Sequence, residues 1–275
     1  MPERDRIAGR TRVGQGREAE IFAWDDDTVL RLLRADGDLQ RVRREEAAMR
    51  FAADGGVDVP RVHGTQLEDG RAGLIMDRVD GPDLITLMGK RPWAVPRVAR
   101  IVGQAHARMH EVVAPTDLPP LRGVARAKIE RARDLPAELA TLALTTLESL
   151  PDGDRLCHGD FHPGNVLLGR QGPAVIDWTD ATRGDPAGDI ARSCVLLRVA
   201  AVQEHMPSLL QRLQTRGRGA FVRLYLRAYR RIRPIDAALV ARWEFVRAAD
   251  RVFEGVEGER AALFELLERR ASEVT

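Results

Sequence analysis

A run of eight residues, His158–Asn165, constrains this chain more than any other part of its sequence. It reads His-Gly-Asp-Phe-His-Pro-Gly-Asn, and Asp177 follows twelve positions after Asn165. These residues have the chemistry that phosphoryl transfer requires: one carboxylate to accept the proton of an attacking hydroxyl, and two oxygen ligands to hold magnesium against the phosphates of ATP. We therefore predict that Asp160 is the catalytic base and that Asn165 and Asp177 bind Mg²⁺.

The residues after this run predict a β-hairpin. Two short apolar runs, Val166–Leu168 and Ala174–Ile176, are separated by Gly169–Gly172, which is a hairpin signal. The second strand would return Asp177 to the side of Asn165. A polar turn without chemistry is the alternative, because Asp and Asn are common turn residues. The number of matched polar positions and the returning carboxylate favour the catalytic interpretation.

The same region carries a resemblance to a known family. The spacing of His158, Asp160 and Asn165 matches the catalytic loop of protein kinases. The chain as a whole resembles the aminoglycoside phosphotransferase-like (phosphotransferase enzyme) family, which also includes choline, homoserine, fructosamine and methylthioribose kinases. The matching positions run in order from about Gly14 to Asp189, and Trp178 favours this family over ordinary protein kinases. The segments that carry the resemblance are His158–Asp160, Asn165–Leu167, Ile176–Trp178, Gly184–Pro186 and Asp189.

The resemblance implies an α+β architecture with the two-lobed protein-kinase fold. A small N-terminal lobe of antiparallel sheet and one helix, residues 1–79, would cover ATP. A larger and mainly helical lobe, residues 80–275, would carry the catalytic loop and bind the substrate.

Two glycines of the small lobe, Gly14 and Gly16, precede a strand-like stretch, Glu20–Trp24. A glycine turn between two strands can offer backbone N–H groups to phosphate oxygens. The third glycine of the kinase pattern is Ala19 here, so a plain hairpin turn is an equally good interpretation.

Arg31 lies in the next predicted strand, Thr28–Leu33, where these kinases usually place a phosphate-binding lysine. The chain has only two lysines, Lys90 and Lys128, and both follow the small lobe. The guanidinium fork of Arg31 could bind phosphates and a helix carboxylate together. Alternatively, Arg31 points to solvent in a chain that is generally rich in arginine.

A helix is predicted from Asp38, as its N-cap, to about Ala53. Its expected buried stripe is Leu39, Val42, Met49 and Ala53. Glu45 and Glu46 both border this stripe, and either could pair with Arg31. The register of the family favours Glu45.

The predicted hinge between the lobes follows the apolar strand Leu74–Met76. By resemblance, Met76 would lie behind the adenine, while the backbone carbonyl of Asp77 and the N–H of Val79 would bind its edge. A surface loop after an edge strand is the alternative.

In the larger lobe, His106 and His110 stand four residues apart on a predicted helix over Pro96–Val113. Without a third ligand nearby, a structural role is favoured over zinc binding. A later helix is predicted from Asp185 to about Val202. Asp189 at its start could simply cap this helix, whereas the resemblance gives it a supporting role beneath the catalytic loop, which we favour over a catalytic one. Arg216–Gly219 is predicted to be a flexible loop.

Three helices are predicted at the C-terminal end, and by resemblance the acceptor would lie against them. Glu244, Arg247, Arg251 and Glu254 share one helical face with alternating sign, so we expect them to pair with one another. The pattern neither requires nor excludes an aminoglycoside, which as a polycation would need an acidic pocket.

Composition narrows the class of protein. The chain has 275 residues, 44% hydrophobic and 31% charged, with a net charge of +2 and a pI near 8.8. Its arginines are interleaved with acids, so no nucleic-acid surface is expected. Cys157 and Cys194 are too few for a disulfide framework, and neither a signal peptide nor a membrane-spanning run is evident. A reduced, cytoplasmic protein is expected.

The favoured function is phosphorylation of a small-molecule hydroxyl, with ATP and Mg²⁺ as cofactors. A small atypical protein kinase is the first alternative, because Gly16–Ile21 also resembles small archaeal-type kinases. A nucleotide-binding pseudokinase that acts as a partner module is the second, and only Arg31 supports it. The acceptor and the oligomeric state stay open at this point.

Overall fold

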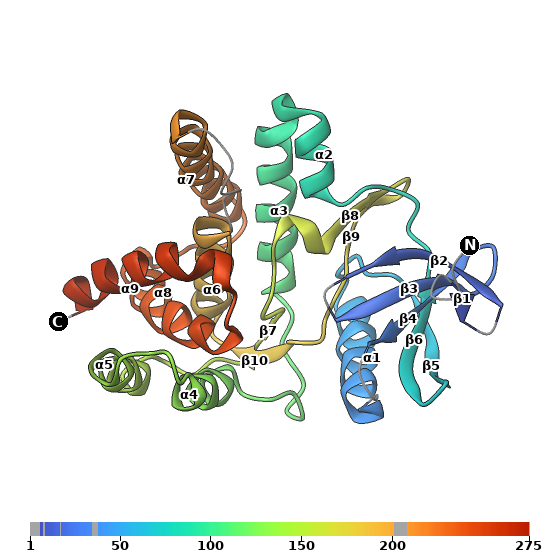
Figure 1. Ribbon diagram of the computed structural model, residues 1–275, viewed down its shortest axis with the longest axis horizontal. Coiled ribbons are helices and arrows are strands. Elements are labelled where there is room, and N and C mark those ends of the chain that lie inside the picture. Colours follow the sequence, from blue (N-terminus) through green and yellow to red (C-terminus); the bar gives the residue numbers. More distant parts are fainter. Residues whose placement is uncertain (1–5, 8, 17, 35–37, 201–207, 275) are drawn as a thin grey trace.

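The computed structural model describes residues 6–7, 9–16, 18–34, 38–200 and 208–274. A sheet with one helix forms one lobe, and most of the helices form the other (Figure 1). The predicted kinase-like α+β fold with two lobes is confirmed. Two short strand pairs and helices α2 and α3 lie between the sheet and the C-terminal helices (Figure 1).

The small lobe is an antiparallel sheet with the strand order β1-β2-β3-β4-β6-β5. Its strands are β1 (Arg6–Ile7), β2 (Arg10–Gln15), β3 (Ala19–Ala23), β4 (Thr28–Leu33), β5 (Val62–Glu68) and β6 (Arg71–Asp77). An Asx turn links β3 to β4, because the Asp25 carboxylate accepts hydrogen bonds from the N–H groups of Asp27 and Thr28 at 3.0 and 2.8 Å. All six residues of the central strand β4 are buried, so Arg31 lies inside the lobe rather than at its surface.

Helix α1 (Leu39–Asp54) packs beside the sheet (Figure 1). Asp38 caps it by accepting a hydrogen bond from the N–H of Gln40 at 2.9 Å, as predicted. The buried stripe runs through Val42, Met49 and Ala52, whereas Ala53 is exposed. The prediction of Ala53 was therefore wrong by one position. The buried face is centred on Glu45, and Ala52 follows it by seven residues, close to two full turns, whereas Ala53 is rotated a further angle of about 100° away from the core.

The larger lobe is mainly helical. Its helices are α2 (Leu84–Lys90), α3 (Val95–Met109), α4 (Leu121–Arg131), α5 (Ala137–Glu148), α6 (Pro186–Val199), α7 (Ser208–Arg230), α8 (Ala237–Arg251) and α9 (Arg260–Val274). Short 3₁₀ turns are η2 (Pro92–Ala94), η3 (Pro163–Asn165), η4 (Val252–Glu254) and η5 (Glu257–Glu259).

The prediction of a loop at Arg216–Gly219 was wrong, because this segment lies inside α7. Glycine weakens a helix by only about 1 kcal/mol, and α7 is anchored further along by the fully buried Tyr225 and Tyr229. Helix α3 ends at Met109, before the predicted Val113, and the predicted end of α6 at Val202 falls outside the described residues.

Two short strand pairs carry the catalytic region between the lobes. Strand β7 (Arg155–Cys157) pairs with β10 (Thr182–Gly184), and β8 (Val166–Gly169) forms a hairpin with β9 (Gly172–Val175), as its turn residues predict.

The chain that follows β6 packs directly on this hairpin. The N–H of Leu168 donates to the carbonyl of Pro82 at 3.0 Å. A Cβ atom on Gly81 would lie 1.9 Å from the carbonyl oxygen of Leu168, so only glycine allows this approach. The connection between the lobes is thereby held against the catalytic hairpin.

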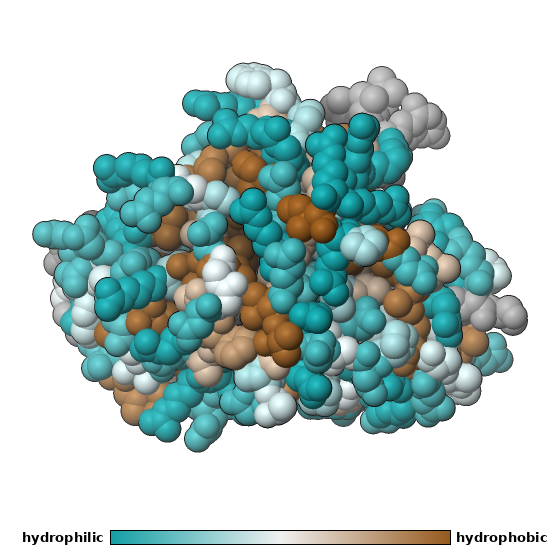
Figure 2. All heavy atoms as spheres, turned by 180° about the vertical axis from the view of Figure 1, so that it is seen from behind, coloured by the Kyte–Doolittle hydropathy of each residue, from teal (hydrophilic) through white to brown (hydrophobic). Residues whose placement is uncertain are grey.

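The exposed surface is largely hydrophilic, with apolar residues in separate patches on the face that Figure 2 shows. Among the described residues, no helix combines the length and apolar character that a membrane span requires.

Candidate active site

The predicted catalytic loop, His158–Asn165, begins where β7 ends. Gly159 adopts a φ of +80°, and a Cβ atom there would lie 2.1 Å from the carbonyl oxygen of Asp180. Both the backbone conformation and the lack of space therefore require glycine. This turn carries Asp160 into the cleft, and η3 follows it to Asn165.

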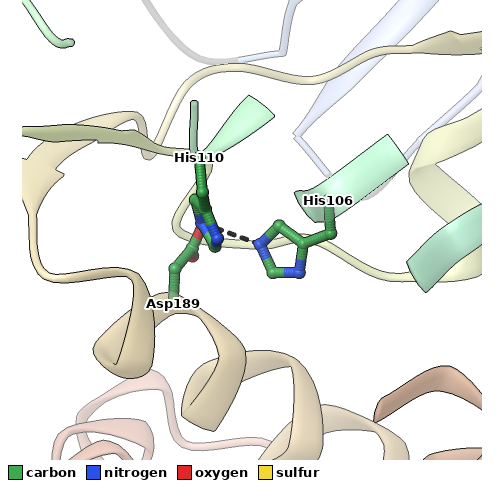
Figure 3. A group of neighbouring side chains, drawn as sticks. All are labelled: His106, His110 and Asp189. Atoms are coloured by element: carbon green, nitrogen blue, oxygen red, sulfur yellow. Dashed lines mark hydrogen bonds and ion pairs between the residues drawn. The ribbon is translucent and has the colours of Figure 1, made fainter. Parts of the chain in front are cut away.

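Asp189 holds the loop from below, at the start of α6. Its Oδ2 accepts the N–H of His158 at 2.7 Å, and its Oδ1 accepts the N–H of Gly159 at 2.9 Å. The Nε2 atoms of His106 and His110 lie 3.0 and 3.2 Å from the same Oδ2 (Figure 3). Burial alone would raise the pKa of Asp189, but the two histidines outweigh it and hold the pKa well below its usual range. The predicted supporting role of Asp189 is confirmed.

The two histidines are bound on their other sides by tyrosines. His106 Nδ1 lies 2.7 Å from the Tyr225 hydroxyl, and His110 Nδ1 lies 2.8 Å from the Tyr229 hydroxyl. Burial lowers the pKa of His106 to about 3, so this ring is neutral. A third potential metal ligand, Asp189, does lie beside the pair, contrary to expectation. Because every ring nitrogen and both oxygens of Asp189 already have protein partners, the cluster is structural.

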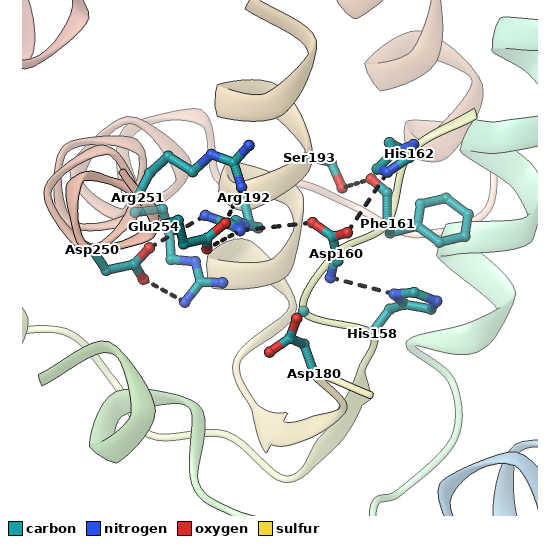
Figure 4. Close-up of polar contacts among 12 residues, drawn as sticks. His158, Asp160, Phe161, His162, Asp180, Arg192, Ser193, Asp250, Arg251 and Glu254 are labelled. Atoms are coloured by element: carbon teal, nitrogen blue, oxygen red, sulfur yellow. Dashed lines mark hydrogen bonds and ion pairs between the residues drawn. The ribbon is translucent and has the colours of Figure 1, made fainter. Parts of the chain in front are cut away.

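Asp160 faces the cleft with 29% of its side chain exposed. Its carboxylate lies 3.6 Å from Nη2 of Arg192 and 3.7 Å from Nε2 of His162 (Figure 4). Burial opposes ionisation of Asp160, but the nearby ring of His162 and the charge of Arg192 outweigh it, so its pKa lies below the usual range. Asp160 is therefore a carboxylate at neutral pH. Asn165 is tied to it, since Asn165 Nδ2 donates to the backbone carbonyl of Asp160 at 2.9 Å.

Asp177 returns to the site at the end of the hairpin. The N–H of Ile176 donates to the carbonyl of Asn165 at 3.0 Å, so Asp177 emerges beside Asn165, as predicted. Asp177 has a φ of +63°, a left-handed conformation that costs a non-glycine residue about 1–3 kcal/mol and is typical of functional sites. Its Oδ1 accepts hydrogen bonds from Arg31 Nη2 at 2.7 Å and from Thr179 Oγ1 at 2.6 Å.

Arg31 joins the small lobe to this carboxylate. Its Nη1 donates to Glu45 Oε2 at 2.8 Å, while Glu46 pairs instead with Arg50 on the surface of α1. The expected pairing with Glu45 is therefore present. Burial raises the pKa of Glu45 to about 7, against the opposing charge of Arg31 and with a further rise from Asp177.

One large cleft between the lobes contains most of the predicted site. Its volume is about 1610 Å³. The predicted residues that line it are Gly14, Gly16, Arg31, Met76, Asp77, Val79, Asp160, Asn165 and Asp177. Glu45 does not line the cleft. It is only 2% exposed and reaches the site through Arg31.

A network of charges beyond Asp160 was not predicted. Arg192 of α6 is 1% exposed, and it contacts Glu254 and also Asp250 at 3.5 Å (Figure 4). Thr179 was missed too, although its position two residues after Asp177 is a local signal for a side-chain hydrogen bond. No local signal marks Arg192, because its partners lie on other elements.

The expectation for the C-terminal charges was largely wrong. Within the set Glu244, Arg247, Arg251 and Glu254, only Arg251 and Glu254 pair with each other. The pairs formed with other residues are Glu244 with Arg198 and Arg270, Arg247 with Asp250, Arg251 with Glu259, and Glu254 with Arg192 and Lys128. Arg247 and Asp250 are three residues apart within α8, but the other partners come from α4, α6, η5 and α9, and helical spacing within α8 does not reveal those.

Comparisons with solved structures give the fold. A choline/ethanolamine kinase family protein from Mesorhizobium loti is 19% identical, with 100% of this chain and 90% of that one covered and a TM-score of 0.64. An aminoglycoside-3'-phosphotransferase of type VIII is 20% identical, with 92% and 96% covered and a TM-score of 0.62. A macrolide 2'-phosphotransferase from Brachybacterium faecium is 20% identical, with 97% and 90% covered and a TM-score of 0.58.

No curated protein sequence matches the chain. The phosphotransferase enzyme family, in contrast, matches residues 10–235, which include the glycine turn, the hinge and the whole catalytic region. Together with the geometry of the cleft, this match identifies the chain as a member of the phosphotransferase enzyme family.

Proposed function

We propose that this protein is a kinase that transfers the γ-phosphate of ATP to a hydroxyl group of a small molecule and requires Mg²⁺. The observation that carries the proposal is the opening of Asp160, Asn165 and Asp177 onto one cleft, directly beside Arg31. A carboxylate base, two oxygen ligands and a cation are the parts that phosphoryl transfer needs.

The small lobe, residues 1–79, would cover the nucleotide. Gly14, near the end of β2, and Gly16, in the turn towards β3, both line the cleft. Neither has a positive φ, and a Cβ atom at either would meet only ordinary contacts at 3.6–3.7 Å. The fold itself does not require glycine at these positions, which supports a close approach of phosphates to the backbone. The adenine would then lie near Met76, Asp77 and Val79.

The size of the cleft supports a second ligand. Ligand pockets usually have volumes of roughly 300–1,000 Å³, whereas this cleft has about 1610 Å³. The lobe 80–275 would therefore bind an acceptor beside the nucleotide, between Asp160 and the C-terminal helices.

The donor set at the hairpin fits a magnesium ion. Within the described part of the chain, both bonds to Asp177 end on Oδ1, which leaves Oδ2 for a metal. The bond from Asn165 Nδ2 to Asp160 orients the amide so that its oxygen is available. Carboxylate and amide oxygens are the hard ligands that Mg²⁺ prefers. The bound ion would neutralise charge on the phosphates.

Asp160 would act on the acceptor. Its low pKa keeps it ionised, so it can orient the hydroxyl and accept its proton as the oxygen bonds to the γ-phosphorus. The bond from that phosphorus to the bridging oxygen of ADP breaks, and ADP leaves with the electron pair. Arg31, fixed by Glu45, would place positive charge beside the phosphates.

Single-turnover ATP consumption against a panel of metabolites and antibiotics tests this function. We expect one hydroxylated small molecule to gain a phosphoryl group, detected by mass spectrometry, and the Asp160→Asn variant to give no such product. Phosphate on a protein side chain would contradict the proposal in favour of a protein kinase. Nucleotide binding without transfer to any acceptor would contradict it in favour of a non-catalytic partner module.

A further inference from the structure

The acceptor end of the cleft has an apolar wall. We define this end as the part of the cleft between Asp160 and the elements α6, α7, η4 and η5. Leu196 and Leu197 line it from the end of α6, and Phe221 lines it from α7. Ile85 of α2 lies on the other side of the catalytic loop, 3.1 Å from the position of a Cβ on Gly164. An acceptor here meets aliphatic and aromatic side chains on two sides.

The carboxylates of the acceptor end are already neutralised by the protein. Among the residues that the structure describes, those that line it are Asp160, Asp180, Glu254 and Glu259. Each forms an ion pair with an arginine or lysine: Asp160 with Arg192 at 3.6 Å, Asp180 with Lys128 at 3.9 Å, Glu254 with Arg192, and Glu259 with Arg251 at 2.8 Å. Arg218 lines the same end. The four acids are thus balanced by four cations: Arg192, Lys128, Arg251 and Arg218.

Two of these cations, Arg192 and Arg251, are not free to move away for a ligand. Arg192 is 1% exposed and Arg251 is 8% exposed. Arg251 binds both oxygens of Glu259, at 2.8 and 2.9 Å, and Arg192 connects Asp160 to Glu254 (Figure 4). An ammonium group that replaced either arginine would leave a buried guanidinium without its partner, which is strongly unfavourable. A polycationic acceptor therefore finds no unpaired carboxylate among these four.

We propose that the acceptor is an uncharged alcohol with an extended apolar surface, which this end binds by hydrophobic contact while one hydroxyl reaches Asp160. This inference rests on the proposed function for the identity of the reacting group. The apolar surface would lie against Leu197 and Phe221. Discrimination against polyamines follows from the balanced charges, because specificity needs an unfavourable term for the wrong ligand as well as a favourable one for the right ligand.

Binding measurements test the acceptor class separately from catalysis. Calorimetric titrations use the wild-type protein with Mg²⁺ and a non-hydrolysable ATP analogue. The probes are erythronolide B, an uncharged polyol macrolactone; choline, a single cation; and kanamycin, a polycation. We expect erythronolide B to bind most tightly, with an affinity that salt does not change. Any kanamycin binding should be weak and should disappear as salt screens it.

Two variants locate the binding surface. Leu197→Ala and Phe221→Ala should each weaken erythronolide B binding by about tenfold, the loss expected for one large apolar contact. Leu197 is only half-buried, so it gives an interpretable result even if Phe221→Ala folds poorly. Phe253→Ala is the matched control, because Phe253 is exposed and does not line the cleft.

The outcomes separate the two proposals. Tighter binding of kanamycin or choline than of erythronolide B, no binding of erythronolide B, or equal losses in Leu197→Ala and Phe253→Ala would each overturn the acceptor class. Assays of the same proteins with ATP against the acceptor panel report on phosphoryl transfer. If erythronolide B binds through Leu197 but no ATP-dependent transfer occurs, the acceptor class is supported and the proposed function is contradicted.

Discussion

The catalytic loop has carboxylates on two sides, and they are bound in different ways. Below the loop, Asp189 is completely buried and accepts four hydrogen bonds, two from backbone N–H groups and two from histidines. Above it, Asp160 and Asp177 keep 29% and 41% of their side chains exposed to the cleft. A carboxylate whose oxygens are all occupied by hydrogen bonds can only stabilise the structure. A partly exposed carboxylate can bind a metal ion or accept a proton. The comparison predicts that variants of Asp160 and Asp177 lose activity, whereas variants of Asp189 lose stability.

Replacement of the open carboxylate beside Arg31 should have the largest effect. Asp177→Ala is expected to remove activity and to weaken nucleotide binding specifically when Mg²⁺ is present, because it deletes a charged ligand. Asn165→Ala should do the same less severely, since it deletes a neutral ligand. Nucleotide titrations with Mg²⁺ and with a chelator measure both. Equal losses under the two conditions would rule out metal ligation by these residues.

Arg31 provides the next largest effect. Arg31→Ala should lose most activity, because Asp177 and Glu45 would both lose their shared cation. Arg31→Lys should keep a substantial part, because a point charge remains without the two-pronged geometry. Steady-state ATP turnover measures both variants, with Arg50→Ala on the exposed face of α1 as the control. Unchanged turnover in Arg31→Ala would remove Arg31 from the site and would favour the non-catalytic alternative.

Below the loop, Asp189→Asn should act on stability. An amide keeps the shape but loses the charge, and its NH₂ group would face N–H donors. We expect the free energy of unfolding to fall by about 3 kcal/mol, as measured by urea denaturation. Asp185→Asn is a matched comparison, because Asp185 starts the same helix and its carboxylate accepts, within the described part of the chain, only the N–H of Ala187. A similar small loss in both variants would break the proposed distinction.

Glu45 should give the smallest effect, visible as a pH dependence. Its pKa is raised from 4.5 to about 7 in the folded protein, so the folded state binds more protons than the unfolded state between these values. Its contribution to stability therefore falls as pH rises through this window. Glu45→Gln cannot titrate, so its stability relative to wild type should improve from pH 4.5 to about pH 7 and then stay level. A constant difference across this range would show that Glu45 does not titrate with a raised pKa.

Local sequence features predicted the centre of the site well. Asp160, Asn165 and Asp177 lie within one turn and one hairpin, where glycine positions and short apolar runs determine the backbone. For Arg31, the helix pattern left Glu45 and Glu46 open as partners, and the register of the resembling family favoured Glu45, with which Arg31 does pair. The relative positions of Asp160, Asn165 and Asp177 were predictable because few long-range contacts are needed to bring them together.

Features that depend on several elements were not predictable in the same way. Arg192 reaches Asp160 from α6 and is fixed by residues of α8 and η4. The pairing of Glu244 with Arg270 of α9 likewise depends on how helices pack. Which partner a long charged side chain contacts depends on how the helices pack against one another. The periodicity of one helix does not contain that information. The mistaken loop at Arg216–Gly219 has the same origin, because tertiary packing of α7 outweighs the local preference of two glycines.

The turnover of Asp160→Asn tests the central claim most directly. Asparagine keeps the size of the side chain but cannot accept the proton. We predict that turnover falls at least about a hundredfold, while ATP affinity and unfolding temperature stay close to wild type. Near-wild-type turnover in the folded variant would contradict the assignment of Asp160 as the catalytic base.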